Sequence, residues 1–584
     1  MNTINSQDNQ APNEAGFAVL RTGDHWLQFV NPSTILSTNR IEDVIPILKQ
    51  IEQATASGSY AAGFLTFEAA SAFDRALQTH EPGAMPLAWF GLYDEVEIIE
   101  NLHSEQPESV HLCWTPSVSE SQYTDTVKRI KEEIRAGNTY QVNYSFRQRS
   151  PFTQNPYASF VSLTRQHTTP YAAFINTGAH AVSSLSPELF FSMENGQITC
   201  RPMKGTAPRG KTQSEDKKLQ RSLKQSEKDK AENLMVVDMI RNDLGRVATD
   251  IHTSKLFSLE TYETLYQMTS TVTGKSTESL TNIFKALFPS ASITGAPKVN
   301  TINLIRQLEQ DAREVYTGTV GFITPDHRAQ FNVAIRTLVI DLENQQATYG
   351  AGSGIVWDSD PQSEYQECIT KTKIVSDRSD EFNLLETLRW SPNERYYLLD
   401  YHLARLQASA THFLFDINMS VVKEKLHVFA ESLDQAPHRI QLQLDKKGNI
   451  ALSANPQPTS SSEYRVSIST IPIDSEDRFM YHKTTRRGVY EEILAAHPTV
   501  DDVLLYNRKR EATESCIANL VVVMDGQHFT PPVESGLLNG TYRQDMIDKG
   551  KLQERVISID SLGDYDEVYL INSVRGKIDI ELVS

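Results

Sequence analysis

The chain has 584 residues, of which 39% are hydrophobic and 22% charged, and its formal net charge is −18. This length predicts at least two domains. The acidic balance argues against nonspecific binding to nucleic acid or to an anionic membrane. The sequence has no run of 18 apolar residues and no basic-then-apolar leader, so neither a membrane span nor a signal peptide is expected. Four scattered cysteines without metal-binding spacing indicate a reduced, cytoplasmic protein.

The first part of the chain alternates strand-like and helical patterns after a polar, aperiodic stretch. Residues 1–14 predict a disordered tail. Hydrophobic periodicity and stop signals such as Gly137-Asn138 define the helices. The expected elements, in order, are a helix near 40–56, a helix over 121–136, a long helix over 217–249, strands over 315–324, 330–342 and 345–358, and a helix over 361–376.

A charged stretch, "DRSDE" at 377–381, indicates a linker between two domains. After it the pattern predicts a strand, a turn and a helix over 382–413. The later strand candidates are 438–445, 502–507, 520–526 and 567–574. Both halves therefore predict an α+β fold, with mixed sheets and helices rather than regular alternation.

The stretch "TCRPMKGTAPRG" (199–210) combines a strand-like run with a predicted turn around Gly205, Thr206 and Pro208. Lys204 stands at the start of that turn. It is either a surface lysine or an amine directed into a pocket, where it could act as a nucleophile.

Two acidic pairs have helical spacing. Asp229 with Glu232, and Glu364 with Glu367, are each three residues apart, so each pair shares one helix face. Facing one pocket, they would form an oxygen-only site suited to Mg2+. The alternative is two solvated helix faces.

Gly350, Gly352 and Gly354 alternate along a predicted strand, where backbone N–H groups could approach an anion closely. A plain turn is the alternative. No nucleotide-binding fingerprint is present.

Six motifs in one order carry a resemblance. They are "RPMKGTAPRG", "AENLMVVDMIRNDLGRV", "FPSASITGAPK", "EVYTGTVGFI", "VAIRTLVI" and "GAGSGIVWDSDPQSEYQE". Over residues 15–376 the chain resembles chorismate-utilising enzymes, which include anthranilate, aminodeoxychorismate and isochorismate synthases. The resemblance implies a chorismate-binding fold for these residues.

Two positions point within that family to aminodeoxychorismate synthases. These carry "KGT", as here with Lys204, where anthranilate synthases have alanine. Water-using relatives have a lysine base where this chain has Gln141. The resemblance implies that Lys204 attacks chorismate C2 and that ammonia then adds at C4. It implies Mg2+ ligation by Glu232 and Glu367, with Asp229 and Glu364 in support. Glu188 and Lys298 are further candidates, for which structural ion pairing is the alternative. It also implies substrate contacts from Gly205, Thr206, Tyr316, Arg336, Gly352, Ser353 and Gly354.

In the second half, Lys483 follows an extended stretch, Glu514 precedes a strand, and "SGLLNGTYRQ" (535–544) is a glycine-bounded turn into a helix that could hold a phosphate. His402 and Arg405 share one helix face. An ordinary α+β domain with surface cations is the alternative.

Residues 382–584 resemble the fold-type IV enzymes that use pyridoxal 5′-phosphate (PLP), which include aminotransferases and aminodeoxychorismate lyase. The resemblance implies that Lys483 binds PLP covalently and that Glu514 pairs with its ring nitrogen. Arg405 and Thr541, with Ser573, would hold the phosphate. The "KREATE" stretch lacks the glycine usual in this family.

Together the two resemblances imply conversion of chorismate and ammonia to p-aminobenzoate and pyruvate for folate synthesis. None of the four cysteines lies in a glutaminase-type turn, so ammonia from a separate glutamine amidotransferase subunit is expected. A homodimer through the second half is a further expectation. The alternatives are a fused aminotransferase, an anthranilate- or isochorismate-type synthase, or a degenerate scaffold.

Overall fold

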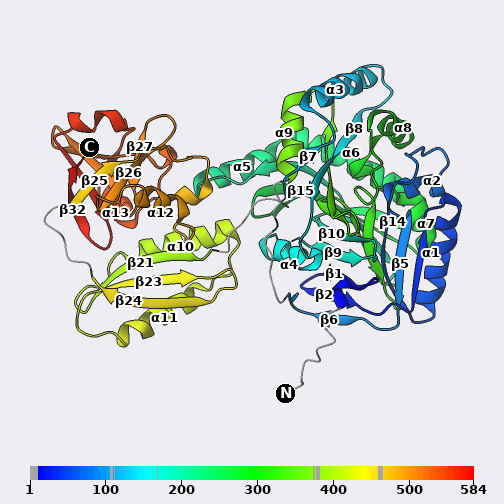
Figure 1. Ribbon diagram of the computed structural model, residues 1–584, viewed down its shortest axis with the longest axis horizontal. Coiled ribbons are helices and arrows are strands. Elements are labelled where there is room, and N and C mark those ends of the chain that lie inside the picture. The colour runs from blue at the N-terminus through cyan, green and yellow to red at the C-terminus, as the bar shows by residue number, and fades with distance from the viewer. Residues whose placement is uncertain are drawn as a thin grey trace. The chain divides into compact units, whose positions relative to one another are not determined.

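The computed structural model describes residues 11–104, 110, 112–167, 169–372, 375, 382–457 and 464–583 (Figure 1). Residues 1–10 of the expected tail and the expected linker, 377–381, lie outside them. The chain divides into two units. The N-terminal unit comprises residues 1–207, 223–261 and 266–379, and the C-terminal unit comprises 208–222, 262–265 and 380–584.

Two ten-stranded sheets build the N-terminal unit. The first follows the order β16 (Gly295–Ala296), β8 (Gln141–Pro151), β20 (Gln346–Ile355), β19 (Thr337–Asp341), β10 (His180–Ser186), β9 (Tyr171–Asn176), β1 (Ala18–Thr22), β2 (His25–Phe29) and β6 (Glu97–Ile99), with β7 (Thr115–Pro116) beside β8. The second follows β13 (Met203–Pro208), β15 (Leu265–Lys275), β12 (Gln197–Arg201), β11 (Leu189–Glu194), β18 (Ala329–Val333), β17 (Thr319–Ile323), β4 (Tyr60–Leu65), β5 (Ala88–Tyr93) and β3 (Thr34–Thr38), with β14 (Thr249–Thr261) beside β15.

The two sheets pack face to face, because one apolar cluster joins Leu20 and Phe29 of the first to Phe64 and Phe322 of the second. Helices bury the outer faces. The second sheet is covered by α1 (Ile41–Ala56), α2 (Ala70–Phe73), α6 (Glu227–Leu244) and α7 (Leu280–Leu287), and the first by α3 (Glu120–Arg135), α4 (Pro156–Gln166), α8 (Lys298–Leu308) and α9 (Pro361–Thr372). This is the mixed α+β arrangement that the sequence predicts.

Three local expectations are wrong. The helix over 217–249 is two helices, α5 (Gln213–Gln225) and α6, because Ser226 is extended and its hydroxyl caps α6 by accepting from the Asp229 amide. The single strand over 330–342 is β18 and β19, which lie in different sheets and are separated by Arg336 at φ +52°. The turn at Lys204 is the edge strand β13, where a proline is tolerated.

The C-terminal unit has two sheets and four helices of its own besides the start of α5. The four-stranded sheet follows β22 (Arg395–Tyr396), β21 (Leu384–Ser391), β23 (His438–Leu444) and β24 (Ile450–Pro456). The eight-stranded sheet follows β27 (Ala512–Ser515), β26 (Asp502–Tyr506), β25 (Tyr464–Ile468), β32 (Gly576–Leu582), β31 (Glu567–Asn572), β28 (Asn519–Met524), β29 (Gln527–Thr530) and β30 (Gln553–Glu554). The helices are α10 (Leu399–Phe413), α11 (Met419–Glu431), α12 (Gly488–Ala495) and α13 (Thr541–Asp548).

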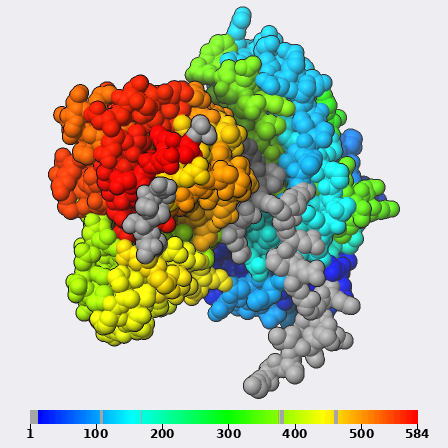
Figure 2. All heavy atoms as spheres, turned by 60° about the vertical axis from the view of Figure 1, so that its left-hand side comes forward, coloured from blue at the N-terminus to red at the C-terminus, as the bar shows by residue number. Residues whose placement is uncertain are grey.

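The four-stranded sheet has one apolar and one polar face. Leu388 and Leu442 pack with residues of α10 and α11 in one core. Thr387 and Gln441, which point the opposite way along the same strands, line a cavity that also touches the eight-stranded sheet. In the space-filling view the β23 and β24 segments, in yellow, lie against the orange and red segments of the same unit (Figure 2). No helix of the described residues has the length and apolar character needed to cross a bilayer.

Candidate active sites

Lys204 is held in place from both sides of β13. Its carbonyl accepts a hydrogen bond from the Asn233 amide of α6 at 3.5 Å, and the carbonyl of Gly205 accepts one from Gln267 of β15 at 2.9 Å. Gly205 has φ +88°, and a Cβ built there would lie 3.0 Å from the Cβ of Asp229. Glycine therefore permits both this backbone conformation and the approach of α6.

The Lys204 amine points toward the first sheet. A Cβ built on Gly354 of β20 would lie 3.5 Å from Lys204 Nζ and 2.3 Å from the amide nitrogen of Gln141 on β8. These three residues come from three strands of two sheets, so the group joins an edge strand of the second sheet to two strands of the first. The structure thus brings together Lys204 and Gln141, the two positions that the sequence singles out.

Burial lowers the pKa of the Lys204 ammonium, against the opposing charges of Glu232 and Glu188. Burial also raises the pKa of the fully enclosed Glu188 carboxyl to about 7, although Ser292 and Lys204 act in the other direction. A lysine and a carboxyl thus lie within electrostatic reach of each other with their pKa values moved toward each other, which favours proton exchange near neutral pH.

The two helical acidic pairs lie within electrostatic reach of Lys204 and of each other, because Glu232 and Glu367 act on Lys204 and Asp229 and Glu364 act on Glu232. Burial raises the pKa of Glu232, and the charges of Asp229 and Glu364 raise it further. Glu367 forms an ion pair of 2.7 Å with Lys371 on the next turn of α9. Among the described residues no three carboxylate, histidine or cysteine side chains are close enough together to enclose a metal ion.

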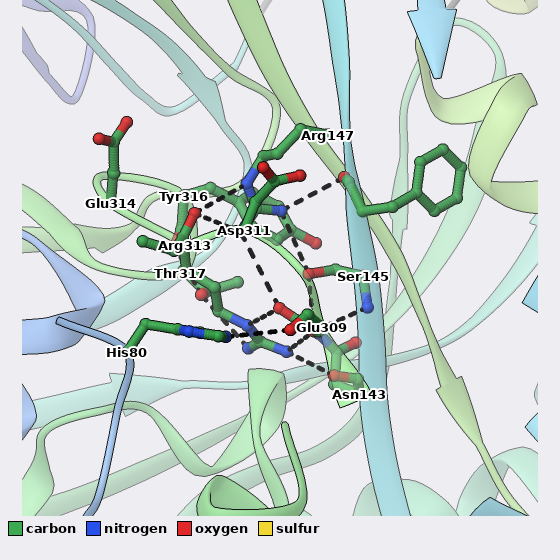
Figure 3. Close-up of polar contacts among 12 residues, drawn as sticks. His80, Asn143, Ser145, Arg147, Glu309, Asp311, Arg313, Glu314, Tyr316 and Thr317 are labelled. Carbon is green, nitrogen blue, oxygen red and sulfur yellow. Dashed lines mark hydrogen bonds and ion pairs between the residues drawn. The ribbon is translucent and has the colours of Figure 1, made fainter. Parts of the chain in front are cut away.

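Tyr316 lies across β20. A Cβ on Gly350 would lie 2.1 Å from Tyr316 Cγ, and one on Gly352 would lie 3.0 Å from its hydroxyl oxygen, so the ring occupies the space that these glycines leave. Behind the ring, the guanidinium carbon of Arg147 lies 5.0 Å from the ring centroid. Glu309 holds this wall together by a 2.6 Å ion pair with the buried Arg313 (Figure 3).

The remaining expected substrate residues are placed less directly. The Thr206 side chain is exposed and donates to Gln267 at 3.0 Å. The Ser353 hydroxyl points to the outer helices and bonds Tyr123 at 2.9 Å, which leaves only its backbone for a ligand. Arg336 lies between β18 and β19, close enough to Tyr349 to lower the pKa of that phenol against the larger effect of burial. Lys298 pairs with Asp243 at 2.8 Å, which is the structural role weighed for it.

The C-terminal unit contains a cavity of about 270 Å³, into which Lys483 projects. The segment before α12 that carries Lys483 is fixed by pairing with β21, because the Lys483 carbonyl accepts from the Leu385 amide at 2.9 Å. Burial lowers the pKa of the Lys483 ammonium to about 8, and the nearby guanidinium groups of Arg405 and Arg487 lower it too.

Glu514 lines the same cavity at the end of β27. Burial raises the pKa of this carboxyl to about 7. The Tyr490 hydroxyl donates to it at 2.9 Å and the Asn519 amide at 3.3 Å. These donors fix the orientation of Glu514, so that it can pair with one protonated ring nitrogen.

Arg405 marks another part of the cavity, beside the start of α13. Three of its five N–H donors are engaged, two with Glu386 at 2.7 and 2.9 Å and one with the Asn539 carbonyl at 3.1 Å. Two donors remain for a ligand anion. Thr541, at the first turn of α13, bonds His402, and with Ser573 it lines the cavity. Arg405 and the N-terminus of α13 can therefore hold a phosphate.

Sequence reasoning missed three residues of these sites. Lys371 donates to the Gly352 carbonyl at 2.9 Å, and its signal is the i,i+4 spacing from Glu367. Glu386 bonds both His402 and Arg405, and these bonds lower the pKa of its carboxyl to about 2 although burial opposes the change. Tyr490 has no local signal, because its role depends on a strand 24 residues away.

The chain matches the sequence models of two protein families. The chorismate binding enzyme family matches residues 21–377, which is more than half of the chain, and the amino-transferase class IV family matches residues 383–583. Each match covers one of the two candidate sites.

Individual relatives agree with the first of these matches. Aminodeoxychorismate synthase component 1 of Salmonella typhimurium is 36% identical over 267 residues, which is 45% of this chain and 58% of that protein. Anthranilate synthase component 1 of Aquifex aeolicus is also 36% identical, over 45% of this chain and 53% of that protein. The chain thus spans less than two thirds of the length of either relative.

The fold of a solved structure agrees with the match to the chorismate binding enzyme family. The crystal structure of anthranilate synthase component I from Streptococcus pneumoniae superposes with a TM-score of 0.54 at 25% identity, over 61% of this chain and 92% of that one. The chain belongs to the chorismate binding enzyme family, and a class IV aminotransferase region follows the chorismate-binding part.

Proposed function

We propose that this chain is a bifunctional enzyme that converts chorismate and ammonia to 4-amino-4-deoxychorismate and then releases pyruvate to give p-aminobenzoate. The observation that carries the proposal is the placement of Lys204 next to Gln141, within electrostatic reach of Glu188. This arrangement offers an amine nucleophile and a carboxyl that can carry its proton, and it has a glutamine at the position where water-using relatives have a lysine base.

In the first reaction the neutral Lys204 amine attacks chorismate C2, the ring double bonds shift, and the C4 hydroxyl leaves as water with the proton that the lysine nitrogen gives up. Glu188 relays that proton, because it is a buried carboxyl within electrostatic reach of the amine and its pKa is raised to about 7. Ammonia then adds at C4, the double bonds shift back, and Lys204 leaves C2 as a neutral amine after taking up the proton that the new C4 nitrogen loses. Tyr316 and Lys371 adjoin Gly352, where they can bind a substrate carboxylate.

A divalent cation fits the chemistry of the first site. Its carboxylates supply only oxygen donors, and although no three of the described ones already enclose an ion, the charges of Asp229 and Glu364 raise the pKa of Glu232, a repulsion that a cation would relieve. Mg2+ would be held by Glu232 and Glu367, with Asp229 and Glu364 in support. When bound, it would neutralise a substrate carboxylate.

PLP fits the second cavity by the chemistry of its lining. Lys483 would bind the aldehyde of PLP, Glu514 would pair with its ring nitrogen, and Arg405 with Thr541 would hold its phosphate. When bound, the cofactor serves as an electron sink. The side chains of the cavity hold the cofactor and move one proton. The neutral amine of Lys483, which burial favours, removes the proton at C4 of the aminated ring, and Glu514 keeps the ring nitrogen protonated.

The ammonia for the first reaction would come from a separate glutamine amidotransferase subunit, because none of the four cysteines lies in the Gly-x-Cys-x-Gly turn of a glutaminase nucleophile. Free ammonium should replace that subunit at high concentration. A homodimer through the C-terminal unit remains part of the proposal.

The test is product identification. The full chain is incubated with chorismate, Mg2+, PLP and ammonium, and the products are separated by chromatography. We expect p-aminobenzoate and pyruvate in equal amounts. Anthranilate or isochorismate would refute the role of Lys204, and accumulation of 4-amino-4-deoxychorismate would refute the second step only.

An aminotransferase is the second candidate for residues 383–583, since the family that matches there is named for that reaction. Such an enzyme would pass the amino group to an α-keto acid. Adding an α-keto acid to the PLP-loaded protein together with an amino donor would then change the absorbance of the cofactor repeatedly, with no release of pyruvate from 4-amino-4-deoxychorismate.

A further inference from the structure

The cavity around Lys483 is strongly cationic. Its charged lining consists of Arg405, Arg439, Lys483, Arg487, Arg575 and a single carboxylate, Glu514. A cavity with five cations and one anion in its wall attracts anionic ligands, and low-dielectric walls strengthen that attraction. The cations of the wall that have no partner in the fold indicate how many anionic groups the ligand carries.

Three of the five cations already have a role. Arg405 is neutralised by the bidentate Glu386 and adjoins the start of α13, so it belongs with the expected phosphate. Lys483 lies within electrostatic reach of Glu514. Arg487 donates to the Cys516 carbonyl and lies 4.6 Å from the ring centroid of Tyr490, so it forms part of the wall next to Glu514.

Arg439 has no such role in the fold. It projects from the polar face of β23 and has no hydrogen-bond or ion-pair partner among the residues that the structure describes. In the register of the sheet it stands directly opposite Arg389 of β21. Like charges directly opposite each other destabilise a strand pair. Only Arg389 has a counter-ion, Glu394, at 3.2 Å. An anion in the cavity would compensate the second charge.

Arg575 belongs to a different wall, the turn between β31 and β32. Its amide donates to the Asn572 side chain at 2.8 Å, which fixes the turn, and its guanidinium carbon lies 5.4 Å from the ring centroid of Tyr464. Contact with an aromatic face leaves the charge of the guanidinium uncompensated, and the structure gives it no carboxylate partner among the described residues. Two walls of one cavity thus each offer an arginine without a counter-ion.

We propose that Arg439 and Arg575 form a dicarboxylate subsite beside Lys483, so that the substrate of the C-terminal unit carries two carboxylates. Each guanidinium presents a planar set of donors that matches one carboxylate. The inference rests on the proposed function of the same cavity. It narrows the substrate class to a primary amine with two carboxylates, which includes 4-amino-4-deoxychorismate and excludes amino acids with one carboxylate.

The experiment compares two probes without an amino group on the full-length, PLP-loaded protein. One is 3-(carboxymethoxy)benzoate, which carries two carboxylates, and the other is benzoate, which carries one. Binding is followed by the visible absorbance of the bound PLP, which reports only on this cavity and not on the chorismate site. The wild type is compared with Arg439→Gln, Arg575→Gln and Arg439→Lys. Arg508→Gln is the matched control, because Arg508 is 77% exposed and pairs with Asp474 outside the cavity.

We expect the dianion to bind at least tenfold more tightly than benzoate. Each glutamine variant should reduce that preference about tenfold while its PLP absorbance stays normal, Arg439→Lys should restore part of it, and Arg508→Gln should retain it. Equal affinity for both probes in the wild type, or an unchanged preference in both glutamine variants, would overturn the subsite.

The outcome separates this inference from the proposed function. Release of pyruvate from 4-amino-4-deoxychorismate without any dianion preference would leave the lyase standing and refute the subsite. A dianion preference that both arginines control, without pyruvate release, would support the subsite and assign it to an aminotransferase of dicarboxylic amino acids.

Discussion

The two site lysines, Lys204 and Lys483, have opposite electrostatic surroundings. Burial lowers the pKa of both, but the neighbours of Lys204 are chiefly carboxylates, Glu232 and Glu188 foremost. The neighbours of Lys483 are foremost the guanidinium groups of Arg405 and Arg487. Carboxylates favour the charged form of a lysine and guanidinium groups favour the neutral form.

The difference shows how one residue type is adapted to two tasks. The carboxylates at Lys204 provide a proton acceptor and can hold a cation, but they work against the neutral amine. The arginines at Lys483 favour the neutral amine and attract anions. The first site should therefore depend on the removal of a proton from lysine, and the second on the binding of anionic groups.

The largest effect should come from exchanging the two lysines for alanine one at a time. Lys204→Ala should lower chorismate amination by at least about 10³-fold, because it removes the amine that lies next to Gln141. Pyruvate release from added 4-amino-4-deoxychorismate should be unchanged. Lys483→Ala should give the reverse pattern. The measurement is the rate of each half-reaction with its own substrate.

Each lysine variant thus serves as the control for the other. If Lys204→Ala retained its amination rate, the covalent role would be refuted. If either variant impaired both half-reactions, the two sites would not be independent. The comparison of their electrostatic surroundings would then not explain their separate tasks.

A smaller effect is expected from Glu514→Gln. The amide keeps the shape of the side chain and a bond to Tyr490, but it removes the negative charge that would keep a ring nitrogen protonated. The loss of one charge-assisted hydrogen bond, about 2 kcal/mol, corresponds to ~30-fold slower pyruvate release. Rates at saturating PLP test this, and amination in the same variant should be unaltered.

The smallest effect concerns pH. Because burial raises the pKa of Glu188 to about 7, its carboxylate is present above that pH and is lost below it. Amination, measured at a constant concentration of free ammonia, should fall about fivefold between pH 7 and pH 6. Glu188→Gln should be slower and should lack this inflection. An unchanged inflection in the variant would assign the titration to another group.

Local patterns predict much of the fold. The helices α1 and α3 lie within a residue or so of their expected bounds, because their apolar periodicity and stop signals are local. The division of residues 330–342 between two sheets could not be predicted, since it depends on the unusual backbone of Arg336. The strand β13 was not predicted, because Gly205 and Pro208 are typical of turns. Both residues are nevertheless compatible with a sheet edge.

The candidate sites follow the same rule. Lys204, Gln141 and the glycines of β20 could be identified from motifs, and the structure places them together. The buried position of Glu188, beside Lys204 and Ser292, required the three-dimensional fold. Glu386 and Tyr490 could not be found from sequence, because each acts through a residue distant in the chain.

Gly354 has a consequence beyond its place in β20. A methyl group at this position would lie against both the Gln141 amide and the Lys204 amine. The space next to the Lys204 amine therefore depends on the absence of one carbon atom at position 354. If Lys204 acts as proposed, any side chain at this position would limit how closely the substrate ring could approach its nitrogen.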